Sequence, residues 1–419
     1  MSENGRPRLL HIAGSSMFGG DSVLILEMGH AAQAAGFEVD ILATHSVFQD
    51  FIRESGLGLV DLDVIRREIR PLWDLKGLAR LTSFLRDSSY SVVHTHTSKP
   101  GVVGRLAAKR AGVPVIIHTV HGFGFHEESG AMARRIYAAV ERTATRWCDR
   151  IVTVSEYHRS VALSLGIAPP EKVIAIPNGV PSNRALSQHS PKEIRHQLGF
   201  GDEFLVLSTG RLAEQKGLEY LIRAVPLIPT RGRSLKLLLA GDGPLRDELH
   251  SLASSLGVED QVCFLGFRDD IGDLLTVADL VALPSLWEGL SISLLEAMAA
   301  GKPVVTTTIG SNREVTGNGY AAVLVPSKDP VSLASAIGHL MVDELRRQQL
   351  GTRAAETQRE RYGMDRMLGA YLAEYELLLG RSTGGGSPTH TPDGSNGKVS
   401  GLIGPKEIMG AEKGAKWAG

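Results

Sequence analysis

Short apolar runs alternate with helical patterns in two successive series, and this alternation constrains the fold more than any other feature of the chain. The first series predicts strands at residues 8–13, 38–44, 92–95, 115–120, 151–155 and 173–176. Helical patterns separate them at residues 22–35, 74–87, 101–111, 131–147 and 157–165. The second series predicts strands at residues 204–209, 236–240, 262–265, 280–284, 304–306 and 322–325. Strands alternating with helices are typical of parallel sheets with crossover helices, so we expect an α/β chain with two Rossmann-like domains.

A length of 419 residues, of which 43% are hydrophobic, suffices for two globular domains and a tail. The expected parts are a first domain at residues 1–180, a linker and entry segment at 181–203, a second domain at 204–364, a closing helix at 365–381 and a tail at 382–419. The tail is rich in Gly, Ser, Pro and Lys, and this composition predicts disorder.

Charge and cysteine usage exclude several classes of protein. A net charge of -1 gives no indication of nucleic-acid binding. Two cysteines in different halves, Cys148 and Cys263, favour reduced thiols and a cytoplasmic protein. The first residues lack the apolar core of a signal peptide, and no apolar run approaches the roughly 20 residues that span a bilayer. We therefore expect any membrane contact to be peripheral.

Residues 279–307 predict a buried strand, a loop with Glu288, a helix from about Ser291 to Ala300 and a second strand. The free amides at such a helix start can bind an anion. Glu296 lies five residues inside the helix, roughly 7 to 8 Å along its axis. One carboxylate could hold a sugar and the other a ribose, with phosphates between them. The alternative is that Glu288 caps the helix and Glu296 is a solvated surface residue.

The loop GRLAEQKG carries two cations, Arg211 and Lys216, between a strand and a helix start, an arrangement suited to a diphosphate. It does not follow the Walker pattern. Residues 264–268 follow a short strand and could frame a flat base through backbone groups. In the first half, Gly19 and Gly20 lie at a strand-to-helix turn and His121 leaves a buried strand beside two glycines. Each of these features is also compatible with a purely structural turn.

His94 and His96 alternate on one predicted strand and so point to the same face. Such a pair can hold a metal, which gives a rival interpretation as a metal-dependent barrel hydrolase. That interpretation needs further ligands at other strand ends of one barrel, whereas the chain divides into two halves. We instead expect these residues to line a cleft whose basic rim consists of Lys99, Arg105, Lys109 and Arg110.

The helix predicted at residues 131–147 and the segment after it combine cations with apolar residues. The cations are Arg134, Arg135, Arg142, Arg146 and Arg150, beside Ile136, Tyr137 and Trp147. A basic amphipathic helix can rest on an anionic membrane surface, and this gives the hypothesis of a peripheral membrane contact. The alternative is an ordinary solvated helix face.

Four of these segments together resemble a known family across nearly all of residues 8–380. They are the Gly19–Gly20 turn, the HGF segment at His121, GRLAEQKG, and EGLSISLLEAMAAGKPVV with its paired carboxylates. The chain resembles the retaining glycosyltransferases of family 4, which have the GT-B fold of two Rossmann-like domains facing each other across a cleft. It is also similar to bacterial transferases that build exopolysaccharide, capsule or O-antigen units.

The resemblance implies a role for each candidate residue. Arg211 and Lys216 would neutralise the donor diphosphate, aided by the backbone of Gly19 and Gly20. Glu296 would hold the ribose, and Glu288 would grip the donor sugar. The remaining implied contacts are the amides of Gly289, Leu290 and Ser291 at the sugar, His121 at the anomeric centre or β-phosphate, and Leu265 and Arg268 at the base.

The same resemblance implies neither metal nor cofactor, and fixed cations would stabilise the leaving phosphate. Asp61 and Asp63 match the DxD string of metal-dependent transferases but lie far from the donor loops in sequence, so we treat the match as coincidence. Two positions depart from the family pattern. Asp21 and Ser22 follow the glycine pair where many relatives have Glu, and Ser291 stands where many have Gly.

The sequence thus predicts retaining transfer of a hexose or N-acetylhexosamine from a nucleotide sugar, expected to be UDP-linked, to a lipid-linked or other saccharide. The expected location is cytoplasmic, with the inner membrane face as a further hypothesis. Two alternatives stay open, a nucleotide-sugar epimerase of the same fold and a non-catalytic nucleotide-sugar-binding subunit.

Overall fold

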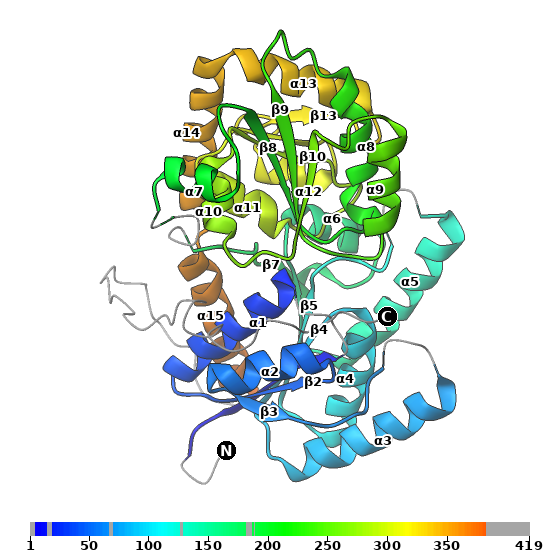
Figure 1. Cartoon of the computed structure of the whole chain (residues 1–419). Helices are drawn as coiled ribbons and strands as arrows, with labels where there is room; N and C mark the ends of the chain where they lie inside the picture. Colours follow the sequence, from blue (N-terminus) through cyan, green and yellow to red (C-terminus); the bar gives the residue numbers. More distant parts are fainter. Residues whose placement is uncertain are drawn as a thin grey trace. The chain divides into compact units, whose positions relative to one another are not determined.

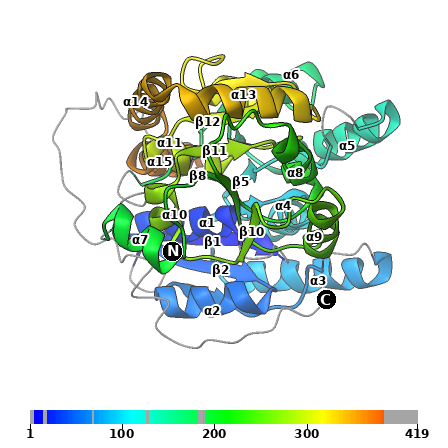
Figure 2. The ribbon, with the colours of Figure 1, turned by 45° about the horizontal axis from the view of Figure 1, so that its top comes forward.

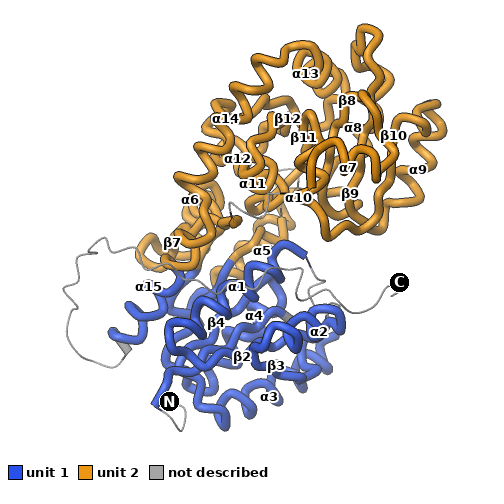
Figure 3. The backbone as a smooth tube through the Cα atoms, turned by 60° about the vertical axis from the view of Figure 1, so that its left-hand side comes forward, with its two compact units in different colours: residues 1–119, 143–151, 371–419 blue, residues 120–142, 152–370 orange. Residues whose placement is uncertain are grey.

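The computed structural model describes residues 5–14, 19–66, 70–125, 129–181, 187 and 189–382, and the chain divides into two compact units (Figure 1). Unit 1, blue in Figure 3, comprises Met1–Thr119, Thr143–Ile151 and Tyr371–Gly419. Unit 2, orange in Figure 3, comprises Val120–Arg142 and Val152–Ala370. Apart from Ser382, which ends the last helix, the predicted tail lies outside the described residues.

The first sheet has seven strands in the order β3-β2-β1-β4-β5-β6-β7. Its strands are β1 (Arg8–Gly14), β2 (Glu38–Ala43), β3 (Gly58–Val60), β4 (Val92–His96), β5 (Val115–Val120), β6 (Arg150–Thr153) and β7 (Val173–Ala175). The associated helices are α1 (Gly20–Ala34), α2 (Ser46–Ser55), α3 (Pro71–Asp87), α4 (Ser98–Ala111), α5 (Ala131–Ala144), the short 3-10 helix η1 (Thr145–Trp147), α6 (Glu156–Ser164) and η2 (Pro170–Lys172). Pairing is parallel from β3 to β5.

The second sheet has six strands in the order β10-β9-β8-β11-β12-β13, and every neighbouring pair is parallel. Its strands are β8 (Phe204–Thr209), β9 (Leu235–Ala240), β10 (Val262–Gly266), β11 (Leu280–Leu283), β12 (Val304–Thr307) and β13 (Val323–Val325). The helical segments are α7 (Pro191–Gln197), η3 (Glu214–Lys216), α8 (Leu218–Ala224), η4 (Val225–Leu227), α9 (Arg246–Ser255), α10 (Ile271–Val277), α11 (Ile292–Ala299), α12 (Gly310–Val315), α13 (Pro330–Val342), α14 (Glu344–Arg361) and α15 (Met364–Ser382).

Alternate residues of the central strands pack to opposite faces of this second sheet. Phe204 and Val206 join a core with residues of α8, α9 and α13, whereas Leu205 and Leu207 join one with residues of α7, α10 and α11. Figure 2 shows α8 and α9 on one side of the strands and α10 and α11 on the other. Burial on both faces explains why these strands read as continuous apolar runs rather than alternating ones.

The fold class predicted from the sequence is confirmed, and each predicted strand occurs within a residue or two of its expected ends. In the first series, the helix α2 and the three-residue edge strand β3 were not predicted. β3 is short and only half-buried, so its sequence gives no strong hydrophobic pattern. α2 buries Phe48 and Ile52, which lie four positions apart on one face. Among the described residues, no helix is both long and apolar enough to cross a membrane.

The order of the strands determines where a ligand can bind. In the second sheet the chain runs outward from β8 to β10 on one side, then returns to the other side of β8 with β11. The loops after β8 and β11 therefore leave adjacent strands in opposite directions, and open α/β sheets bind ligands at such a point. GRLAEQKG follows β8 and the Glu288 loop follows β11, so both lie at this point.

Candidate functional site

The helix that follows β11 begins one residue later than expected, with Ser291 as its N-cap. The Ser291 hydroxyl accepts a hydrogen bond from the Leu294 amide at 3.4 Å. Ser291 therefore caps α11, and the alternative in which Glu288 caps it is wrong. Ser291, which departs from the glycine of the family pattern, thus has a structural role as the helix cap.

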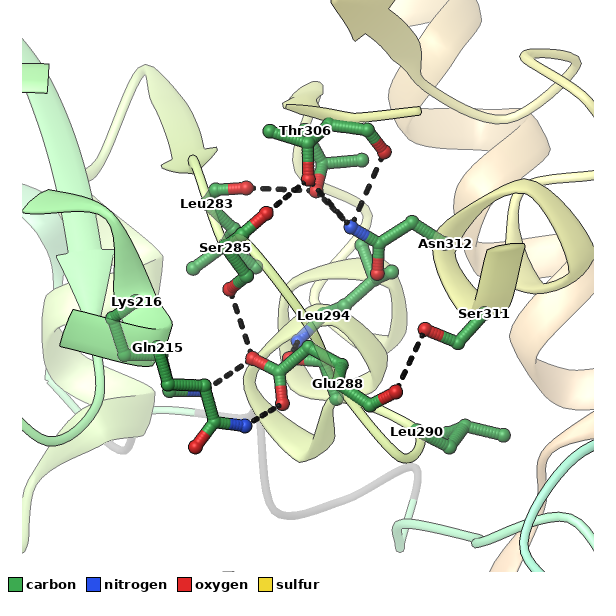
Figure 4. A network of polar contacts seen from close by, with 12 residues as sticks. Gln215, Lys216, Leu283, Ser285, Glu288, Leu290, Leu294, Thr306, Ser311 and Asn312 are labelled. Atoms are coloured by element: carbon green, nitrogen blue, oxygen red, sulfur yellow. Dashed lines mark hydrogen bonds and ion pairs between the residues drawn. The ribbon is translucent and has the colours of Figure 1, made fainter. Parts of the chain in front are cut away.

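Glu288 is the centre of a polar cluster formed by the loops after β8 and β11 (Figure 4). Its side chain is only 7% exposed and accepts a charged hydrogen bond from the Lys216 ammonium at 2.6 Å. The Ser285 hydroxyl donates to the same carboxylate at 2.8 Å, and the Gln215 amide donates at 3.1 Å. Three donors therefore hold one nearly buried carboxylate in place, and the cation compensates its charge.

Further hydrogen bonds fix the backbone of these two loops. The Leu286 amide donates to the Gln215 carbonyl at 2.8 Å, which joins one loop to the other. The Ser311 hydroxyl donates to the Glu288 carbonyl at 3.3 Å, and Thr307 donates to the Ser285 carbonyl at 2.5 Å. Asn312 in turn donates to the hydroxyls of Thr306 and Thr307. The loop around Glu288 is thus supported from β12 and α12.

Two glycines of the turn after β9 support the Arg211 loop. Gly241 has a φ of 146°, and a Cβ there would lie 1.9 Å from the Gly210 carbonyl oxygen. A Cβ at Gly243 would lie 2.4 Å from the Leu212 carbonyl oxygen. The Leu212 amide donates to the Asp242 carbonyl at 2.9 Å. This GDGP turn therefore serves as a support for GRLAEQKG.

The two cations of GRLAEQKG differ in their surroundings. Lys216 is engaged with Glu288, whereas Arg211 is exposed and its guanidinium has no hydrogen-bond or ion-pair partner within the described part of the chain. One positive charge is therefore balanced and the other is available to an anion.

Glu296 is 8% exposed on α11 and its side chain takes part in an interaction, so the alternative of a solvated surface residue is wrong. Arg268 forms two hydrogen bonds with the Asp270 carboxylate, one of them at 2.7 Å from its Nε. This hydrogen bonding to Asp270 raises the pKa of Arg268. Leu265 packs against the sheet core. The charge of Arg268 is therefore compensated inside the protein.

His121 and Gly289 lie close together within unit 2. A Cβ at Gly289 would lie 1.7 Å from the His121 carbonyl oxygen, so only glycine fits there. Leu290 is buried, and its carbonyl accepts a 3.4 Å hydrogen bond from Asn178. The close approach of Gly289 to His121 thus brings the HGF segment to the Glu288 loop.

Gly19 and Gly20 belong to unit 1, whereas the other candidate residues belong to unit 2. Gly20 begins α1, and Gly19 has an extended φ of -166° that any residue can adopt. Residues 15–18 of this turn lie outside the described residues. Asp61 and Asp63 have local partners, Gln49 and Arg66, in the same unit.

The His94–His96 pair lies in the core of unit 1, where a third histidine, His11, joins it. Nitrogens of the three buried rings lie within 4.8 Å of one another, so these residues could hold a metal. They also form hydrogen bonds: His11 Nδ1 to His96 Nε2 at 2.9 Å, and His94 to Tyr375 and Thr119, both at 2.7 Å. Tyr375 belongs to α15.

The two sheets exclude the single barrel that the rival hydrolase interpretation required. The expectation that His94 and His96 line a cleft is wrong, because both side chains are fully buried. The expected basic rim is also wrong in part, because Arg105 is fully buried with its Nε donating to the Gly101 carbonyl, and Lys99 pairs with Asp74 at 2.8 Å.

The histidine cluster predicts a pH dependence of stability. Burial lowers the pKa of His11 to about 3, so His11 is neutral in the folded protein. The unfolded chain binds a proton below its ordinary pKa of about 6.5, so stability should fall as pH falls from there towards 3, by up to about 1.4 kcal/mol per pH unit. Urea unfolding between pH 7.5 and 5 should show a weaker slope for His11→Asn than for wild type. The exposed control His196→Asn should keep the wild-type slope, and an unchanged slope for His11→Asn would contradict the assignment.

Two family models match the two halves of the chain. Residues 190–357 match the family model described as glycosyl transferases group 1, and residues 19–179 match that of a glycosyl transferase 4-like domain. The chain is 26% identical, over 82% of its length and 90% of the other protein, to the Escherichia coli UDP-Gal:alpha-D-GlcNAc-diphosphoundecaprenol alpha-1,3-galactosyltransferase. It is 30% identical to the D-inositol 3-phosphate glycosyltransferase of Actinosynnema mirum, over 71% of this chain and 75% of that one.

A solved structure shows the same fold. Anabaena Alr3699/HepE in complex with UDP and glucose superposes with a TM-score of 0.78 at 23% identity, covering 89% of this chain and 100% of that one. The family models together account for both halves, as residues 19–179 and 190–357. This chain belongs to the group 1 glycosyltransferases, with a glycosyltransferase 4-like first half and the GT-B fold.

Proposed function

We propose that this glycosyltransferase moves a hexose or N-acetylhexosamine from a UDP-sugar to a lipid-linked saccharide, with retention and without a metal. The observation that carries the proposal is the arrangement of Arg211, Lys216 and Glu288 where the strand order reverses. The E. coli relative is named for a UDP-sugar donor and a diphosphoundecaprenol-linked acceptor, and the Anabaena structure holds UDP and glucose.

The charge that develops during the reaction is of the sign that these residues can stabilise. Cleavage of a sugar–diphosphate bond places negative charge on the departing phosphate. Arg211, Lys216 and the amides at the start of α11 would stabilise that charge by fixed electrostatics, the role that a metal fills in other enzymes. In the proposed bound state, Lys216 shares its hydrogens between Glu288 and the diphosphate.

Glu288 is better suited to bind the sugar than to attack it. Its carboxylate accepts hydrogen bonds from Lys216, Ser285 and Gln215, and such stabilisation of the anion weakens a nucleophile. We therefore assign Glu288 to the donor hydroxyls and Glu296 to the ribose. Retention would follow from attack on the same face as departure, with the leaving phosphate accepting the acceptor proton. Leu265, Gly266 and Arg268 would border the base, with Arg268 held by Asp270.

A lipid-linked acceptor implies work at a membrane, so we also propose a peripheral contact with its cytoplasmic face. The proposal requires UDP release from a UDP-hexose to depend on a polyprenyl-diphosphate sugar. We expect turnover to persist in a chelator, and the product to keep the anomeric configuration of the donor by NMR.

The same assay separates the alternatives. A changed sugar formed without an acceptor would identify an epimerase. Donor binding without turnover, across a panel of donors and acceptors, would identify a non-catalytic subunit. Inversion at the anomeric carbon would overturn the retaining mechanism, and loss of turnover in the chelator would overturn metal independence.

A further inference from the structure

Three histidines of unit 1 meet in its core, and the proposed donor chemistry uses none of them. His11 of β1 and His94 of β4 are direct partners in the register of the two strands, and His96 follows two residues later on β4. Because side chains alternate along a strand, all three rings lie on one face of the sheet. Each side chain is completely buried, and one nitrogen of each lies within 4.8 Å of the other two. The pairing of β1 with β4 therefore brings three imidazoles into one group.

The separation of these nitrogens is close to that of a zinc site. Ligand nitrogens around a tetrahedral Zn²⁺ lie about 3.3 Å apart, since each Zn–N bond is about 2.0–2.1 Å long. His11 Nδ1 and His96 Nε2 are 2.9 Å apart, so this pair needs to separate only slightly while the His94 ring approaches. Burial disfavours the charged imidazolium, and the neutral imidazole is the form that binds a metal. Both the geometry and the charge state of the group are therefore compatible with a cation.

His11 has a hydrogen-bonding group that the described residues do not satisfy. A neutral imidazole has one N–H and one bare nitrogen, and both are normally paired when they are buried. His11 Nδ1 is paired with His96, whereas His11 Nε2 is buried and has no hydrogen-bond partner among the described residues. An unsatisfied imidazole beside two others indicates that a ligand completes the group.

The ring of His94 has the kind of partners that hold a metal ligand in place. The Tyr375 hydroxyl lies 2.7 Å from its Nδ1, and the Thr119 hydroxyl lies 2.7 Å from its Nε2. Whichever nitrogen bound a metal, the other would keep a hydroxyl that fixes the orientation of the ring. We propose that His11, His94 and His96 form a structural Zn²⁺ site in the core of unit 1, with an oxygen ligand at the fourth position.

The test is the metal content of the full chain, expressed without a histidine tag in zinc-supplemented medium. We expect about one Zn²⁺ per chain after dialysis, and the visible bands of a tetrahedral site when Co²⁺ replaces it. His11→Asn and His94→Asn should each weaken Co²⁺ binding at least about 100-fold, because a ligand contributes more than an outer partner. Tyr375→Phe keeps all three ligands and should weaken it about tenfold. The control His196→Asn, at an exposed histidine of α7, should bind like wild type.

Thermal unfolding shows which variants fold, and the measurement on the wild-type chain does not depend on them. A wild-type chain without stoichiometric metal would overturn the inference and leave the histidines as a hydrogen-bonded cluster. Unchanged Co²⁺ binding by folded His11→Asn and His94→Asn would overturn it as well, because the metal would then lie elsewhere. Turnover is not a readout here, so failure of the proposed function would leave this result unaffected. A chelator present only during a short turnover assay would not empty a core site, because unit 1 must first open.

Discussion

Lys216→Ala should lower kcat/KM for the UDP-sugar by about 10²- to 10³-fold, the usual cost of removing one fixed donor that stabilises developing charge. The change removes a cation from the proposed diphosphate site and also leaves the Glu288 carboxylate, 7% exposed, without its counter-charge. UDP release under saturating acceptor measures the effect. Lys192→Ala, at an exposed lysine of α7, is the control and should retain wild-type turnover.

A double variant separates catalysis from stability in this prediction. Lys216→Ala alone should lower the unfolding temperature, because a nearly buried carboxylate loses its partner. Adding Glu288→Gln removes the uncompensated charge and should restore much of that temperature while turnover stays low. Recovery of turnover in the double variant would show that Lys216 acts on Glu288 alone and not on the donor. Full turnover in the single variant would remove Lys216 from the site.

Gly241→Ala should destabilise unit 2 by about 2–5 kcal/mol. One part of this cost is backbone strain, because alanine rarely adopts the φ of residue 241, and the other is the collision of the added methyl group with the backbone. The added methyl would lie 1.9 Å from the Gly210 carbonyl oxygen, just before Arg211. The expected fall in Tm is about 5–15 °C. KM for the donor should rise in the surviving folded enzyme, because the Arg211 loop loses its support.

Gly257→Ala provides a matched comparison for this second prediction. Gly257 also has a positive φ, 66°, but nothing lies within 4 Å of its added Cβ. Its cost should be limited to about 1–2 kcal/mol of backbone strain, with KM unchanged. Equal Tm values for the two variants would show that contact with Gly210 is unimportant.

Most of the fold could be predicted because the central strands are buried on both faces. The run Phe204–Thr209 is buried throughout, so its apolar pattern is unambiguous and its boundaries were predicted to the residue. The edge strand β3 has no buried residue, and its sequence carries no comparable signal. The other edge strands, β7, β10 and β13, each bury at least one residue and were predicted, so the missed strand is the one that buries none.

Part of the candidate site could also be predicted from local pattern. Arg211, Lys216 and Glu288 lie in loops that follow predicted strands, and the structure brings Lys216 and Glu288 into contact. Their roles toward a donor stay predictions. Gln215 lies within the GRLAEQKG motif yet was missed, since its contact depends on the path of the Glu288 loop.

The remaining supports were beyond the reach of sequence pattern. Ser285 and Asn312 carry no spacing signal, because serine and asparagine are common in loops for many reasons. The burial of His94 depends on Tyr375, a residue 281 positions further along the chain. A partner so distant leaves no periodic trace near the histidine. Arg150 likewise pairs with a residue far along the chain, Glu374, and this partner leaves no pattern near Arg150.

The return of the chain end to unit 1 has a consequence for engineering. Tyr371 and Tyr375 of α15 meet Thr119 and His94, and Glu374 meets Arg150, all within unit 1. A chimera built to exchange donor specificity should therefore replace unit 2 only as far as residue 370 and keep this chain's own last turns of α15. If the foreign sequence continued to its own C-terminus, non-complementary side chains would instead lie over the three buried histidines.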